Sequence, residues 1–243
     1  MASCSAVLAL VGIAACSFHD SPPAPAGGGD GPGAVDAPVA IDTPLPPPPD
    51  AKVFLDGAQT VSGFLSVTPT SLGMVDINLA NEGTMDWAHW GLNSATTFDR
   101  KSGGTAISNV AVIGGGSQLG VTATAVSASW TNGTPDASAT QTGTGTGTRS
   151  PSALRITVPA DVAQHTLRVY VGNRDSSGRL DVALSDGSAN AYTNTQTGGT
   201  PASHTEYAIT YNAASAGQTL TVTWTDTGDV NSGFVMLLSA TLQ

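Results

Sequence analysis

Residues 154–184 read LRITVPADVAQHTLRVYVGNRDSSGRLDVAL, and this stretch decides the fold of the chain. It contains three runs in which apolar and polar residues alternate, at 154–158, 167–171 and 180–184. Alternation with a period of two is typical of strands that bury one face. The segments between the runs are polar and favour turns, so the stretch predicts three consecutive strands.

The same pattern continues on both sides of this stretch. Residues 220–224 alternate, residues 234–242 form an apolar run, and earlier candidate strands lie at 53–55, 61–67, 74–79, 84–90, 107–113 and 121–130. Residues 140–148 alternate Thr and Gly over most of their length, which fits an edge strand or a loop. Asp-Gly and Asn-Gly dipeptides at 56–57, 132–133 and 186–187 favour tight hairpins. Many short strands without helical periodicity predict an all-β fold, an antiparallel β-sandwich.

The N-terminal region predicts export. Residues 6–15 form a short apolar segment, which suits a signal-peptide core and falls short of the about 20 residues of a membrane-spanning helix. Ile13-Ala14-Ala15-Cys16 resembles the lipobox of bacterial lipoproteins, in which the cysteine is lipidated. The resemblance implies a signal peptide over residues 1–15, a lipid on Cys16 and anchoring to a bacterial membrane. Ser17 in place of aspartate resembles sorting to the outer membrane or cell surface, and an ordinary secretory signal is the alternative.

Residues 16–50 are predicted to form a disordered tether between the anchor and a domain at 51–243. The segment is rich in Pro, Gly and Asp and has few large apolar side chains, so it cannot bury enough surface to fold. Cys4 and Cys16 are the only cysteines, so the mature domain has no internal disulfide and no cysteine-based metal site.

The charge balance excludes one class of partner. The chain has 8 Lys and Arg against 18 Asp and Glu, a formal net charge of −10. Such an acidic chain offers no electrostatic footprint for nucleic acid. Anionic headgroups would repel it, so membrane attachment should depend on the lipid alone.

Several strings together resemble a known type of module. They are DWAHWG at 86–91, WTNGTP at 130–135, RITVPAD at 155–161, TLRVYVG at 166–172, LSDGSA at 184–189 and SAGQTLTVTW at 215–224. Their order resembles a bacterial extracellular β-sandwich of the galactose-binding-domain-like type, over roughly residues 75–242. The resemblance implies a jelly-roll sandwich that serves carbohydrate binding, adhesion or a structural role.

The tryptophan-rich string is the first candidate site. Alternation in a strand puts Trp87 and His89 on one face and Trp90 on the other. We therefore expect one Trp in the core and the other facing outward or lying under a loop. An outward indole would suit stacking against the apolar face of a sugar ring. The alternative is that both indoles are buried.

Further candidates lie near turns. Trp130 precedes a hairpin dipeptide and is either a ligand contact or a core residue. Asn173, Arg174 and Asp175 lie in a polar segment, 173–179, where they would complement sugar hydroxyls or simply form a solvated loop.

Two aspartates are the only metal candidates. Asp226 and Asp229 flank a Thr-Gly pair and could supply oxygen ligands to a structural calcium ion, or form a polar turn. No other cofactor is expected.

Catalytic motifs are missing from the sequence. It has no His-Glu-x-x-His zinc motif, no Gly-x-Ser-x-Gly nucleophile elbow and no phosphate-binding Gly-x-x-x-x-Gly-Lys loop. A glycan hydrolase would need two carboxylates across a cleft. The sequence therefore predicts a non-catalytic, lipid-anchored extracytoplasmic module that binds carbohydrate. The alternative is a structural or adhesive module that contacts surface proteins.

Overall fold

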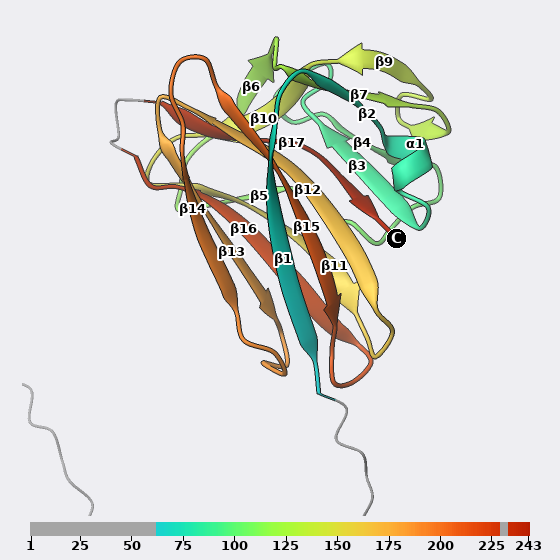
Figure 1. Cartoon of the computed structure of the whole chain (residues 1–243). Coiled ribbons are helices and arrows are strands. Elements are labelled where there is room, and N and C mark those ends of the chain that lie inside the picture. The colour runs from blue at the N-terminus through green and yellow to red at the C-terminus, as the bar shows by residue number, and fades with distance from the viewer. Residues whose placement is uncertain (1–61, 229–232) are drawn as a thin grey trace, which may run out of the picture. The chain divides into compact units, whose positions relative to one another are not determined.

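The computed structural model describes residues 62–228 and 233–243, and this part of the chain is almost entirely β-structure (Figure 1). Strands β1 to β17 form three sheets, and α1 (Leu79–Glu82) is a single turn. The prediction of an all-β, mainly antiparallel sandwich is confirmed. The expected signal peptide, Cys16, the tether, the strand at 53–55 and Asp229 lie outside the described residues.

The largest sheet has nine strands and forms the middle layer. Its path runs through β1 (Phe64–Leu72), β15 (Ser203–Asn212), β12 (His165–Arg174), β17 (Phe234–Leu242), β3 (Asp86–Trp90), β4 (Phe98–Lys101) and β8 (Gly133–Thr134). β10 (Thr144–Thr148) also pairs with β17, and β6 (Leu119–Thr122) pairs with β10. Every pairing in this sheet is antiparallel.

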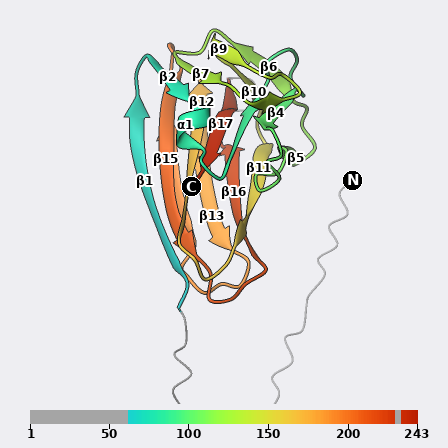
Figure 2. The same cartoon turned by 90° about the vertical axis from the view of Figure 1, so that its right-hand side faces the viewer.

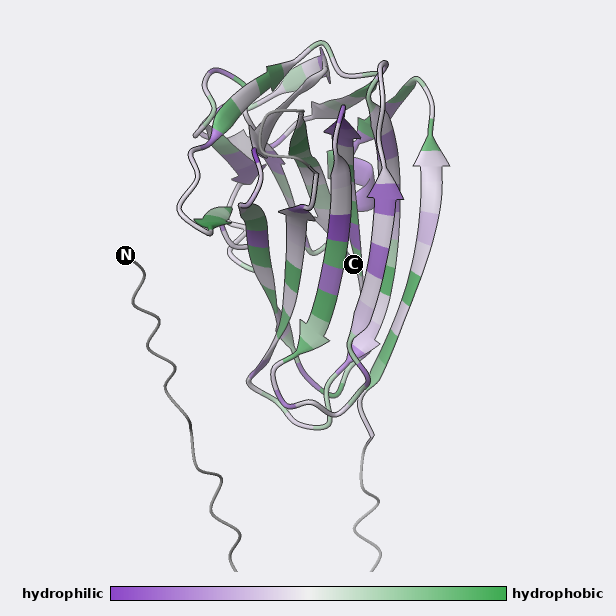
Figure 3. Ribbon diagram, turned by 90° about the vertical axis from the view of Figure 1, so that its left-hand side faces the viewer, coloured by the Kyte–Doolittle hydropathy of each residue, from purple (hydrophilic) through white to green (hydrophobic). Residues whose placement is uncertain are grey.

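A five-stranded sheet covers one face of the middle layer. Its order is β14 (Tyr192–Thr197), β13 (Ser177–Leu184), β16 (Gln218–Asp226), β11 (Ala153–Ala160) and β5 (Ala111–Ile113). The apolar residues at the first, third and fifth positions of all four alternating runs lie in the core between the two sheets. The banded hydropathy of the strands shows this alternation directly (Figure 3). The period-two pattern therefore identified both the strands and their buried faces.

A third, three-stranded sheet covers part of the opposite face. It contains β2 (Val75–Asn78), β7 (Val126–Trp130) and β9 (Ala139–Thr142), and β2 runs parallel to β7. These strands lie together at one end of the sandwich (Figures 1 and 2). A second apolar core, which includes Trp87, Trp130, Tyr170, Met236 and Leu238, fills the space beneath this sheet. Part of the middle layer is consequently buried on both faces.

The structure differs from the predicted strands at particular places. The expected strand at 121–130 is divided into β6 and β7 around Ala123, whose φ is +57°. β4, β14 and β15 were not predicted, although β15 is a central strand of ten residues. The expected loop at 173–179 is only a two-residue turn, because β12 ends at Arg174 and β13 begins at Ser177. In the described part of the chain, no helix is long and apolar enough to span a bilayer.

Candidate functional site

The tryptophan string lies on β3, and its side chains do not reach the surface. Trp87 and Trp90 are each 1% exposed and His89 is fully buried. The predicted alternation is correct, since Trp90 belongs to the core beneath the five-stranded sheet and Trp87 to the second core. The expectation that one of the two faces outward as a sugar platform is wrong, and the alternative, that both indoles are buried, is what the structure shows. The three-stranded sheet covers the face on which Trp87 and His89 lie.

Trp130 closes this second core from β7. Its ring centroid lies 5.6 Å from that of Trp87 and 4.8 Å from that of His89, and its indole N–H donates to the Asp136 carbonyl at 3.1 Å. Trp90 stacks on Phe98 on the other side of the sheet, with centroids 5.9 Å apart. All four aromatic candidates are therefore packing residues in this structure and offer no exposed ring face.

A row of buried polar side chains crosses the sheet beneath Trp130. Ser239 on β17 is paired with His89 on β3, which is paired with Asp99 on β4. Both ring nitrogens of His89, Asp99 Oδ2 and Ser239 Oγ are buried without a hydrogen-bond partner among the described residues. Burial lowers the pKa of His89 to about 4, and a contact with the Thr144 backbone opposes this.

The neighbouring carboxyl shifts in the opposite direction. Burial, opposed by the hydrogen bond from the Asp136 backbone, raises the pKa of Asp99 to about 6. Its Oδ1 accepts that N–H at 3.1 Å. Two titratable groups thus lie side by side in a nearly dry environment.

The candidate loop residues separate into structural and surface positions. Asn173 is 1% exposed, and its amide donates to the carbonyl oxygens of Ser176 at 3.0 Å and Gln196 at 2.8 Å. Its role is to hold the β12–β13 turn, so it is not available to a ligand. Arg174 and Asp175 are exposed, with Arg174 Nε 3.7 Å from Asp175 Oδ2. Asp175 adopts φ +49° at the turn.

The calcium candidate Asp226 is engaged within the protein. Its Oδ1 accepts hydrogen bonds from the Ser176 hydroxyl and from the Gly228 N–H at 3.0 Å. Asp229 lies outside the described residues. Within the described ranges, no group of three or more His, Cys, Asp or Glu side chains could hold a metal ion. Asp226 therefore has the environment of a turn-forming residue.

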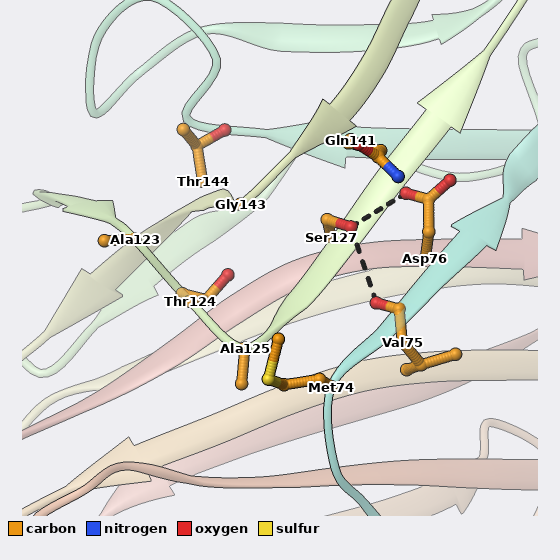
Figure 4. A pocket seen from close by; sticks show the side chains of 10 residues that line it. All are labelled: Met74, Val75, Asp76, Ala123, Thr124, Ala125, Ser127, Gln141, Gly143 and Thr144. Carbon is orange, nitrogen blue, oxygen red and sulfur yellow. Dashed lines mark hydrogen bonds between the residues drawn. The ribbon is translucent and has the colours of Figure 1, made fainter.

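An open concavity lies on the outer face of the three-stranded sheet, and sequence reasoning missed it. It is a groove of about 800 Å³, called here the Asp76 groove. Figure 4 shows its lining residues: Met74, Val75, Asp76, Ala123, Thr124, Ala125, Ser127, Gln141, Gly143 and Thr144. Alternation produces this face, because Ile77, Ala128 and Trp130 on the same strands point into the second core.

Polar groups in the groove are pre-arranged by hydrogen bonds between the strands. The Ser127 hydroxyl donates to Asp76 Oδ1 at 2.8 Å, and the Ser129 hydroxyl donates to Asp76 Oδ2 at 2.7 Å. Ser129 Oγ in turn accepts the backbone N–H of Gln141 at 2.9 Å, and Gln141 adopts φ +47°. Each carboxylate oxygen keeps a further lone pair for a ligand. The row is therefore fixed before any ligand binds.

A second pocket shares a wall with this groove. Residues 123–125 line both, and the second pocket, called here the His204 pocket, has a volume of about 280 Å³. Its other lining residues are Val121, Thr122, Arg174, Thr200, Pro201, Ala202, His204, Phe234 and Met236. Arg174 is the one residue predicted from the sequence as a ligand contact that the structure places in a concavity of this end of the sandwich.

Comparisons with known proteins give limited information. No family model matches the chain, and no curated protein matches it. One similar solved structure is TmCBM61 in complex with β-1,4-galactotriose, at 12% identity and a TM-score of 0.36, covering 56% of this chain and 88% of that one. Another is the enzymatically active domain of bacteriophage CBA120 tailspike protein 4, at 9% identity and a TM-score of 0.32, covering 57% of this chain and 20% of that one. Neither likeness assigns the chain to a family.

Proposed function

We propose that this protein is a non-catalytic binding module and that the Asp76 groove binds a glycan. The observation that carries the proposal is the pre-arranged set of Asp76, Ser127 and Gln141 in an open groove, held in place with the help of the neighbouring Ser129. Groups held in place by the fold bind a ligand without a further ordering cost.

The chemistry of the groove suits sugar hydroxyls. Each hydroxyl is both a donor and an acceptor, so a sugar site needs both kinds of group. Asp76 supplies acceptors, the Gln141 amide supplies both, and the hydroxyls of Thr124 and Thr144 line the same space. Met74 is 92% exposed at the edge of the groove and offers a mobile apolar surface for the C–H face of a sugar ring.

The groove also favours binding over hydrolysis. A glycosidase places two carboxylates on opposite sides of the scissile bond. Among the residues that line the described groove, Asp76 is the one carboxylate, and both of its oxygens already accept serine hydroxyls. This arrangement supports recognition of a glycan without cleavage.

The location of the module is part of the proposal. The lipobox-like Ile13-Ala14-Ala15-Cys16 supports a lipid anchor on Cys16, and the Pro-rich segment after it supports a tether that holds the domain away from the bilayer. The module would then meet glycans at the bacterial surface, in agreement with an acidic chain that anionic membranes repel.

The test is a glycan array probed with the full chain and two variants. Asp76→Asn keeps the size of the side chain and removes its charge, so it should weaken binding about tenfold or more, the usual effect of losing a charge-assisted hydrogen bond. Asp181→Asn is the matched control, since Asp181 is an exposed aspartate on β13 that accepts hydrogen bonds from Thr193 and Arg179. This control should bind like the wild type.

Three results would contradict the proposal. They are no glycan binding by the wild type, equal binding by the wild type and Asp76→Asn, or equal losses in both variants. The melting temperature of Asp76→Asn must also equal that of the wild type, so that weaker binding reflects a change in the groove and not a loss of folded protein. Capture of a surface protein through the groove, abolished by Asp76→Asn, would favour the adhesive alternative.

A further inference from the structure

The His204 pocket has the composition of a small-ligand site and is separate from the Asp76 groove. Its floor is apolar, formed by Val121, Phe234 and Met236, and its volume of about 280 Å³ suits one small ring. Polar residues also line it: the threonines at 122, 124 and 200, His204 and Arg174. An apolar base with a few fixed polar groups is the general character of small-molecule pockets.

His204, which lines this pocket, has a ring nitrogen without a hydrogen-bond partner among the described residues. The residue is 5% exposed, and its Nε2 has no partner among the described residues. A buried polar atom without a partner is costly, and native structures rarely keep one without a reason. The backbone also leaves room for the ring here, since Gly172 opposite His204 in the sheet has no Cβ and an added one would lie 3.0 Å from the imidazole. His204 lines the pocket, so a ligand that fills the pocket lies next to this ring.

Arg174 gives the pocket its charge. No Asp or Glu lines it in the described part of the chain, whereas Arg174 does. Asp175 is adjacent, but its carboxylate is 3.7 Å from Arg174 Nε, which is longer than a hydrogen bond, and it also accepts from the Thr200 hydroxyl. A second guanidinium, that of Arg149, lies over the Phe234 ring at 5.8 Å. Arg149 does not line the pocket and donates to the Gly233 carbonyl at 2.9 Å, so the pocket's own cation is Arg174, for which an anionic ligand group would compete with Asp175.

We propose that the His204 pocket binds the ring of a uronic acid, with the sugar carboxylate on Arg174 and a ring hydroxyl on His204. A planar guanidinium pairs with a carboxylate through two parallel hydrogen bonds, which a neutral sugar cannot form. The threonine hydroxyls then meet the remaining sugar hydroxyls, and Phe234 and Met236 contact the apolar ring atoms. This inference rests on the proposed glycan binding and narrows its ligand to acidic glycans.

The experiment compares an acidic monosaccharide with its neutral counterpart. The full chain is titrated with galacturonate and with galactose, and binding is followed through the histidine ring signals by nuclear magnetic resonance. We expect galacturonate to shift the His204 signals and to bind about tenfold or more tightly than galactose. Arg174→Gln should abolish this preference. Arg179→Gln is the matched control, because Arg179 is an exposed strand arginine paired with Asp181 at 2.9 Å on the five-stranded sheet.

Other outcomes overturn the inference. Equal affinity for the two sugars, or a preference for galacturonate that survives Arg174→Gln, would show that Arg174 does not bind the sugar carboxylate. Acetate that shifts the His204 signals and displaces galacturonate at similar concentration would show a general carboxylate site and not a sugar site. An array that finds only neutral glycans, bound in an Asp76-dependent way, would contradict this inference and leave the proposed function intact.

Discussion

Single substitutions of Asp99 and His89 should change the pH dependence of the free energy of unfolding in opposite directions. Burial lowers the pKa of His89 from 6.5 to about 4, so the unfolded chain takes up its proton first as the pH falls. The folded state therefore loses stability between pH 6.5 and pH 4. The 2.5-unit difference corresponds to about 3 kcal/mol at 1.36 kcal/mol per unit.

Asp99 acts in the same pH range with the opposite sign. Burial raises its pKa from 3.8 to about 6, so the folded state resists ionisation that the unfolded chain accepts. Its contribution to stability is lost as the pH rises from 3.8 to 6, by on the order of 2 kcal/mol once solvent screening is allowed for. In the wild type the two contributions largely offset each other. Each single variant exposes the other residue's contribution.

Urea unfolding of the full chain at several pH values between 4 and 7 measures this directly. Relative to wild type, Asp99→Asn should lose stability on acidification, and His89→Gln should gain it. The double variant should return to a slope close to that of the wild type, since both contributions are then gone. Two single variants with the wild-type slope would refute the reasoning, as would slopes of the same sign.

Three further outcomes are expected from the fold and the N-terminus. Trp87→Ala and Trp90→Ala should each lose about 3–5 kcal/mol in urea unfolding, because each indole is buried in a different core; a variant as stable as the wild type would contradict its burial. Gly91→Ala should lower the free energy of unfolding far more than Gly103→Ala, although both glycines have positive φ. An added Cβ at Gly91 would lie 2.0 Å from a backbone carbonyl oxygen, whereas one at Gly103 would meet nothing within 4 Å. Equal losses would show that the backbone conformation alone sets the loss of stability. Cys16→Ser should abolish fatty-acid labelling and release the protein from membranes, and continued labelling would place the lipid elsewhere.

The main sandwich could be predicted because its strands carry their own signal. In β11, β12, β13 and β16, three successive alternate positions hold large apolar residues, and all of these lie in one core. β15 was missed for a physical reason. Its buried apolar residues are Tyr207, Ile209 and Tyr211, and the residues around them, including the buried His204 and Thr205, are small or polar, as in a turn-rich segment.

The Asp76 groove and the His204 pocket could not be predicted, because they depend on strand pairings that a single sequence does not show. Asp76 meets Ser127 and Ser129 only because β2 pairs in parallel with a strand about fifty residues further along the chain. Nothing local specifies that pairing, since parallel neighbours need a long connection. The burial of Trp87 follows from the same event, because a single strand cannot reveal that another sheet covers its second face. His204 gave no signal, since the strand that holds it was not recognised.

The connection at residues 123–125 separates the Asp76 groove from the His204 pocket, and its side chains belong to neither apolar core. Because these three residues line both compartments, a ligand that displaces them from one side would change the room left on the other. Occupancy of each would then alter the affinity of the other by the same factor, in either direction. Substitutions at residues 123–125 would change the shape of the Asp76 groove and of the His204 pocket together, while the sheets beneath keep their packing.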